Sequence, residues 1–177
     1  MNYHNITTAD MMNGDGLRVV LWLSGCNHHC KNCQNPQTWD VNGGIEFDIN
    51  ASDELFAELE KDYISGITFS GGDPLHENNI KEVLNLITEI KDRFPNKNIW
   101  LYTGYTWESL FFDKDNLKTI YHDQIRRTIM LSCDVVVDGR YINALRDVNA
   151  HWVGSTNQKV IDVKKTFKEN KIVLYCD

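Results

Sequence analysis

Three cysteines stand close together in the segment GCNHHCKNCQN, residues 25–35, which we call the cysteine loop. They are Cys26, Cys30 and Cys33, in the spacing C-x3-C-x2-C, and the loop contains no fourth cysteine. Clusters of the 4Fe-4S type are normally held by four cysteine thiolates. Three thiolates on one loop therefore predict a 4Fe-4S cluster with one iron left open to another ligand.

The same three thiolates could instead hold a zinc ion. A histidine would complete a Cys3His tetrahedron, and the candidates are His4, His28, His29 and His76. Structural zinc sites usually recruit their ligands as separated pairs, so three cysteines on one loop favour the open cluster. The two histidines inside the loop are then interpreted as spacers that face solvent or a partner.

A second chemical feature is the sequence Gly71-Gly72-Asp73-Pro74, which we call the glycine turn. Adjacent glycines leave the backbone uncovered, so that a ligand can approach its carbonyl oxygens closely. A tight turn between two elements would also explain them. Paired with the cysteine loop, the turn is interpreted as a cradle for a ligand.

Four short stretches rich in β-branched and aromatic residues predict the strands that position these features. They are residues 17–23, 66–70, 99–102 and 133–137, and weaker signals place further strands at 159–163 and 172–175. The cysteine loop follows the first strand and the glycine turn follows the second.

Helical spacing of apolar residues separates the strands. Ser52 is expected to cap a helix whose apolar face carries Leu55, Phe56, Leu59 and Tyr63. A stronger pattern covers residues 80–94 and ends before Pro95, and a weaker one covers 116–130. A lysine-bearing helix is expected before residue 172.

Strands that alternate with helices predict an α/β fold, with a mainly parallel sheet and flanking helices. The carboxyl ends of parallel strands share one edge of the sheet, where such folds bind ligands. We therefore expect the cysteine loop, the glycine turn and the turns after the next two strands to meet there. The side chains considered as a further lining are Tyr102, Tyr105, Trp107, Asp138 and Arg140.

The composition excludes several classes of protein. A chain of 177 residues, 42% hydrophobic, suits a single domain over residues 1–177. Its formal net charge of −7 argues against a nucleic-acid-binding surface. Five cysteines, three of them on one loop, fit a reducing compartment, and we see neither a secretory signal nor a membrane-spanning run. We expect a cytoplasmic protein that binds neither nucleic acid nor membrane.

The cysteine spacing resembles that of the radical S-adenosylmethionine (SAM) superfamily, in which a Gly-Gly-Glu-like motif corresponds to the glycine turn. More narrowly, most of the chain is similar to the activating proteins of anaerobic (class III) ribonucleoside-triphosphate reductases. The segments that carry this resemblance are NGDGLRVVLWLSGCNHHCKNCQNPQTW, TFSGGDPL, IWLYTGYTWE, VVVDGRY and GSTNQKVIDV. The resemblance implies a single radical SAM domain, built as a partial (β/α) barrel.

The resemblance also implies an activity. One 4Fe-4S cluster per chain, held by Cys26, Cys30 and Cys33, would bind SAM at its fourth iron and cleave it reductively. The resulting 5′-deoxyadenosyl radical would abstract hydrogen from a glycine of the reductase and form a glycyl radical. No catalytic residue beyond the cluster and SAM is implied. The implied SAM contacts are Asn32, Cys33, Gln34, Gly71, Gly72 and Asp73.

The implied partners are the large subunit of the reductase and an electron donor such as a flavodoxin-type protein, in a homodimer or a hetero-tetramer with the reductase. Other radical SAM functions remain open, namely an activase of another glycyl-radical enzyme such as pyruvate formate-lyase, or a small synthase. A non-catalytic zinc-binding interaction module is the alternative from a different class.

Overall fold

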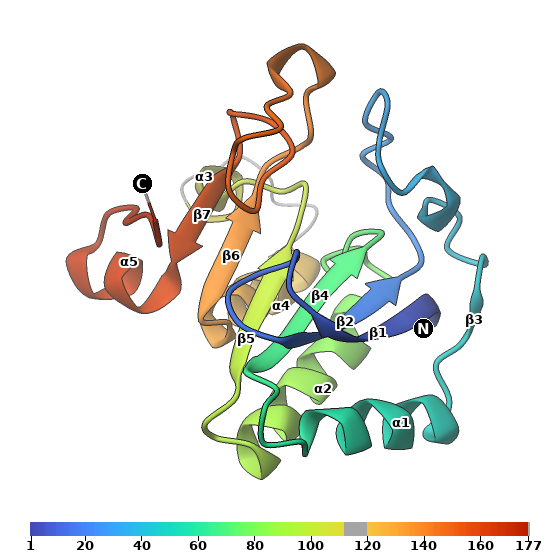
Figure 1. Cartoon of the computed structure of the whole chain (residues 1–177). Helices are drawn as coiled ribbons and strands as arrows, with labels where there is room; N and C mark the ends of the chain where they lie inside the picture. The colour runs from blue at the N-terminus through green and yellow to red at the C-terminus, as the bar shows by residue number, and fades with distance from the viewer. Residues whose placement is uncertain (112–119, 177) are drawn as a thin grey trace.

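The computed structural model describes residues 1–111 and 120–176, which contain a seven-stranded sheet in the order β3-β1-β2-β4-β5-β6-β7 (Figure 1). The strands are β1 (Asn2–Asp10), β2 (Arg18–Leu23), β3 (Ile45–Glu46), β4 (Gly66–Gly71), β5 (Asn98–Tyr102), β6 (Val135–Asp138) and β7 (Lys159–Asp162). The helices are α1 (Ile49–Leu59), α2 (Ile80–Arg93), α3 (Trp107–Phe111), α4 (Ile120–Ser132) and α5 (Val163–Glu169), with short 3-10 helices at Pro36–Thr38 and Asn143–Leu145.

The sheet is mixed, so the prediction of a mainly parallel sheet is wrong. Strands β2, β4, β5 and β6 are parallel neighbours, whereas β1, β3 and β7 pair antiparallel at the two sides of this centre. The connection from β1 to β2, residues 11–17, is shorter than the dozen or more residues that a parallel crossover needs. If β1 and β2 pair with each other, they must therefore do so as an antiparallel hairpin.

The two ends of the sheet are formed by β3 and β7, and no pairing joins them within the described ranges. The partial barrel that the resemblance implies is therefore not confirmed. No helix in residues 1–111 or 120–176 has the length and apolar character needed to cross a bilayer.

Apolar side chains alternate between two cores on opposite faces of the sheet, as the pleat of a strand requires. The larger core contains Leu21, Phe69 and Leu101 together with the buried sides of α1, α2 and α4, which lie on one face of the sheet (Figure 1). The smaller core contains Trp100, whose ring centroid lies 4.9 Å from that of Trp152. Buried strands between two cores hold the strand ends in fixed positions.

The strongest sequence patterns are confirmed by β2, β4, β5 and α2, but helix α1 begins earlier than expected. Its N-cap is Asp48, whose Oδ1 accepts a hydrogen bond from the Ala51 N–H at 3.0 Å, and not Ser52. Ile49 in the first turn is 70% exposed, so the apolar pattern begins only later in the helix. Tyr63 lies beyond the end of α1 and is exposed.

One strand was missed, and two weaker expectations are confirmed only in part. Strand β1 was not predicted, because Tyr3 and Ile6 are its only buried apolar side chains. The strand expected at 172–175 is reduced to a single bridge between Leu174 and Ile161. Helix α4 confirms the second part of the pattern at 116–130, whose residues 116–119 lie outside the described ranges.

Candidate functional site

The cysteine loop leaves the carboxyl end of β2 and is closed by backbone hydrogen bonds at its base. The Gly25 N–H donates to the Thr38 carbonyl at 2.8 Å, and the Cys26 N–H donates to the Trp39 carbonyl at 3.1 Å. Cys26, Cys30 and Cys33 are free thiols of intermediate burial. The base of the loop is therefore fixed to the body of the protein while the three thiols stay accessible.

Left-handed backbone bends shape the outer part of the loop. Asn32 has a φ of 58°, a conformation that asparagine tolerates better than most residues. Its side chain is exposed and donates a hydrogen bond to Asn143 Oδ1 at 3.1 Å. This bond ties the loop to residues 139–158, which lie with the cysteine loop beyond the same edge of the sheet (Figure 1).

In the absence of a metal, the protein environment favours the neutral thiol form of Cys26 and Cys30. Burial raises the pKa of Cys26 to about 11, although backbone N–H groups of His28 and His29 point at its sulfur. Burial also raises the pKa of Cys30, against a backbone hydrogen bond from Tyr141. Metal coordination deprotonates a thiol outright, and backbone N–H groups stabilise the sulfurs of bound iron–sulfur clusters. These donors fit a 4Fe-4S cluster.

The glycine turn lies directly against the base of the cysteine loop. The Asp73 N–H donates to the Gly25 carbonyl at 2.8 Å, and the Gly72 N–H donates to the Leu23 carbonyl at 2.8 Å. A Cβ on Gly72 would lie 2.6 Å from the Gly25 carbonyl oxygen, which real Cβ atoms do not approach so closely. The two predicted features are thus in backbone contact, and a residue larger than glycine does not fit between them.

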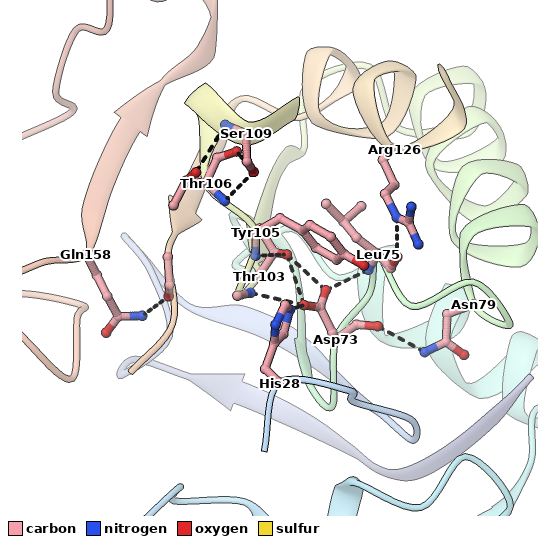
Figure 2. A network of polar contacts seen from close by, with 12 residues as sticks. His28, Asp73, Leu75, Asn79, Thr103, Tyr105, Thr106, Ser109, Arg126 and Gln158 are labelled. Carbon is pink, nitrogen blue, oxygen red and sulfur yellow. Dashed lines mark hydrogen bonds and ion pairs between the residues drawn. The ribbon is translucent and has the colours of Figure 1, made fainter. Parts of the chain in front are cut away.

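The carboxylate of Asp73 organises the strand ends, as Figure 2 shows. Asp73 is 2% exposed, and its Oδ1 accepts hydrogen bonds from the Leu75 N–H at 2.8 Å and the Thr103 hydroxyl at 2.9 Å. Its Oδ2 lies 3.0 Å from the Gly104 nitrogen and 2.6 Å from His28 Nε2. One side chain therefore joins the ends of β4 and β5 to the cysteine loop.

His28 reaches inward from the cysteine loop, so its interpretation as a solvent-facing spacer is wrong. Its side chain is 8% exposed, and its ring centroid lies 5.0 Å from that of Tyr105 in an edge-to-face arrangement. His29 does face outward, with its ring 4.8 Å from that of Trp39. A histidine inside a polar loop has no periodic pattern, so only the contact with Asp73 could have revealed its role.

The sequence matches the family described as "4Fe-4S single cluster domain" over residues 12–161. It is 41% identical over 161 residues to the anaerobic ribonucleoside-triphosphate reductase-activating protein of Enterobacteria phage T4, covering 90% of this chain and 93% of that protein. The proteins of the same name from Vibrio cholerae and Escherichia coli K12 are 37% and 36% identical over 162 residues, covering 90% of this chain and 97% of each relative.

The chain belongs to this family of reductase-activating proteins. The matched range contains the cysteine loop, the glycine turn and the strand ends that Asp73 joins. The resemblance stated from the sequence is therefore confirmed at the level of the family and of its 4Fe-4S domain.

The histidines considered as zinc ligands are dispersed or already engaged. His28 Nε2 is bonded to Asp73, and His76 Nδ1 accepts a hydrogen bond from the Asn78 N–H at 3.3 Å. Among the described residues, no three Cys, His, Asp or Glu side chains converge as a single metal ion would require. The thiolates of a 4Fe-4S cluster bind separate irons and need not converge on one point.

The other turns also meet at the carboxyl edge, as the sequence predicted. The Thr103 N–H donates to the Val137 carbonyl at 3.0 Å, and the Gly139 N–H donates to the Tyr105 carbonyl at 2.9 Å. Tyr105 packs its ring under the guanidinium of Arg126, 4.8 Å from the ring centroid. These contacts hold the ends of β5 and β6 beside the glycine turn.

The five side chains considered as a lining have different environments. Tyr102 and Tyr105 are partly buried, and burial raises the pKa of both phenols. Trp107 is buried, and its backbone N–H donates to Asp138 Oδ2 at 2.7 Å. Burial raises the pKa of the Asp138 carboxyl. Arg140 is exposed. Trp107 and Asp138 therefore support the edge from inside, while Arg140 faces solvent.

Proposed function

We propose that this chain activates an anaerobic ribonucleoside-triphosphate reductase by reductive cleavage of SAM at a 4Fe-4S cluster. The cluster would supply one electron that breaks the bond between the sulfur and C5′ of SAM, and the 5′-deoxyadenosyl radical would take a hydrogen atom from a glycine Cα of the reductase. The observation that carries this proposal is the backbone contact between the cysteine loop and the glycine turn at one strand-end edge.

In this proposal Cys26, Cys30 and Cys33 hold three irons, and SAM binds the fourth through its amino and carboxylate groups. Gly71 and Gly72 have no side chains, so SAM can approach the backbone of the glycine turn beside the cluster. The match to a 4Fe-4S domain over residues 12–161 supports the ligand set, because those residues contain all three cysteines of the loop.

The remaining proposed SAM contacts act through different groups. Asn32 and Gln34 have exposed side chains on either side of Cys33, and their backbone groups are proposed to meet the adenine. The carboxylate of Asp73 already accepts hydrogen bonds from four groups of the protein. Asp73 is therefore proposed to contribute to SAM binding through its backbone, and through its carboxylate only by holding the glycine turn in position.

The proposed partner is the large subunit of the reductase, because the relatives are named as activators of that enzyme. An exposed edge suits a protein substrate, and residues 139–158 present Arg140, Ile142 and Leu145 to solvent beside the cysteine loop. A flavodoxin-type electron donor and a homodimer or hetero-tetramer with the reductase belong to the same proposal.

The test is anaerobic reconstitution with iron and sulfide, followed by reduction in the presence of SAM and the reductase. We expect about four irons and four sulfides per chain. We also expect one 5′-deoxyadenosine for each glycyl radical counted by electron paramagnetic resonance (EPR). A colourless chain that binds stoichiometric zinc would contradict the cluster. Equal radical formation on pyruvate formate-lyase would contradict the choice of reductase.

A further inference from the structure

Resting on the function proposed above, we propose that His28 and Asp73 form a latch that holds the cysteine loop in its cluster-binding shape. His28 lies between two of the cluster cysteines, whereas Asp73 lies in the glycine turn, and their side chains meet at 2.6 Å. Both are positioning residues, because they act on the loop and the turn and not on the reacting atoms.

The carboxylate of Asp73 has no acceptor site left for a ligand. A carboxylate offers about four lone-pair sites. Asp73 fills them with the Leu75 N–H, the Thr103 hydroxyl, the Gly104 N–H and His28 Nε2. Three of these donors belong to the strand ends, and the fourth belongs to the cysteine loop. Among the described residues, His28 is therefore the one partner of the Asp73 carboxylate that comes from the cysteine loop.

A notch at Gly104 gives the His28 ring its place. A Cβ on Gly104 would lie 2.3 Å from His28 Cδ2 and 2.6 Å from His28 Nε2, closer than real Cβ atoms approach other heavy atoms. No positive φ is recorded for Gly104, so the need for glycine here is steric. The ring of Tyr105 closes another side of the notch, with its centroid 5.0 Å from that of His28. The strand-end turn is thus shaped to receive this imidazole.

The second ring nitrogen of His28 can take a further hydrogen-bond partner at the latch. His28 Nδ1 is buried and has no hydrogen-bond partner among the described residues. Buried polar atoms of folded proteins are almost always paired, so a lone one indicates a bound group or water at that position. The backbone N–H of the same residue points at the Cys26 sulfur. Holding His28 therefore also holds a donor to a proposed cluster ligand.

The test uses trypsin on the full-length, metal-free chain, because Lys31 lies in the cysteine loop and is exposed. Cleavage after Lys31 requires the loop to open, and mass spectrometry identifies the fragment 1–31. We expect His28→Ala to be cleaved there at least about tenfold faster than the wild type, since a hydrogen bond to a charged group is lost. Asp73→Asn should give a similar increase.

Matched variants separate the latch from general damage. His29→Ala removes the neighbouring, outward-facing ring and should be cleaved within about twofold of the wild-type rate. His28→Gln restores a donor near the Nε2 position and should recover most of the protection. Gly104→Ala fills the notch while leaving both partners intact, and should open the loop even if His28→Ala fails to fold.

The reconstituted protein gives a second readout. With the latch broken, we expect a chelator to remove iron about tenfold faster, and the EPR signal of the reduced cluster to broaden. We expect the free energy of unfolding of the metal-free chain to fall only by the equivalent of that tenfold change, about 1.4 kcal/mol. The latch would be overturned if His28→Ala were cleaved and lost iron at the wild-type rates. It would also be overturned if His29→Ala changed both rates as much as His28→Ala does.

Failure of the latch and failure of the proposed function have different signatures. The trypsin experiment contains no metal and no SAM, so it measures the latch even in a chain that never binds a cluster. Suppose that the wild type binds its cluster and cleaves SAM, and that His28→Ala matches the wild type in trypsin cleavage and in iron loss. That result would reject the latch and leave the proposed function standing.

Discussion

The two ends of the parallel strands each bury a charged side chain, but they use it differently. At the amino ends, Arg18 is fully buried and donates five hydrogen bonds. The acceptors are Thr68 Oγ1, Asn98 Oδ1 and the carbonyls of Asp15, Ile67 and Asn98. A guanidinium has five N–H donors, so every one is used. Burial nevertheless lowers the pKa of Arg18 to about 10.

At the carboxyl ends, Asp73 is also saturated, but polar atoms around it are left over. His28 Nδ1 and Asn79 Oδ1, on two residues that bond to Asp73, are buried without a hydrogen-bond partner in the described part of the chain. Asn79 donates through its amide to the carbonyls of Ser24 and Asp73, which places it at the base of the site. At the amino ends Arg18 thus uses every donor, whereas beside Asp73 two buried polar atoms have no partner among the described residues.

The largest effect is expected at the carboxyl ends, from removal of one thiol. Cys30→Ala should lose the cluster and all SAM cleavage, because a cluster held by two thiolates is not retained. Cys133→Ala is the control, since Cys133 is buried in the core and its sulfur contacts the Ile129 carbonyl. Iron content and 5′-deoxyadenosine formation are the measurements. Retained SAM cleavage in Cys30→Ala would refute the assignment of this ligand.

At the amino ends we expect a large effect on stability and none on the chemistry. Arg18→Met should lower the free energy of unfolding by about 3–5 kcal/mol, because buried acceptors lose their donor. Urea unfolding of the metal-free chain measures this change. If the folded variant also loses its cluster, the two ends are not independent.

An intermediate effect is expected where the glycine turn meets the cysteine loop. The Cβ introduced by Gly72→Ala must displace the Gly25 backbone. Overpacking of this kind lowers the free energy of unfolding by about 1–3 kcal/mol. We expect this loss in urea unfolding, together with weaker SAM binding measured by calorimetry. Unchanged SAM affinity would show that the close contact serves folding alone.

The smallest effect is expected at the start of α5, which lies beside the amino end of β6 and at the opposite edge of the sheet from the cysteine loop. The Asp162 Oδ1 accepts a hydrogen bond from the Lys165 N–H at 2.9 Å and caps the helix. Asp162→Ala should cost about 1 kcal/mol, as for other N-caps, and should leave iron content unchanged. A loss of iron in this variant would show that the site depends on global stability.

Much of the site could be predicted from the sequence, because its elements have strong local patterns. The run LRVVLWL is sufficient to place a strand, and the helical spacing after Asn79 is sufficient to place a helix. The three thiols of the cysteine loop and the uncovered backbone of the glycine turn indicate which functional groups follow these strands. Their meeting at one edge follows from the parallel centre of the sheet.

The missed features depend on contacts between distant residues. Strand β1 is mostly polar and is held by pairing with β2, so its own residues give little signal. The antiparallel pairing of β1 with β2 results from their short connection, which the strand patterns do not reveal. The bond from His28 to Asp73 joins residues 45 positions apart, and the notch at Gly104 exists only in the folded chain. No local pattern encodes these contacts.

The central claim is that SAM completes the coordination of a cluster at the carboxyl edge. The most direct measurement is pulsed EPR of the reduced, reconstituted protein with SAM labelled by nitrogen-15 at its amino group. We predict a hyperfine coupling between that nitrogen and the cluster spin, because the amino group would bind the iron without a cysteine. A reduced cluster that shows no such coupling at saturating SAM would contradict the account.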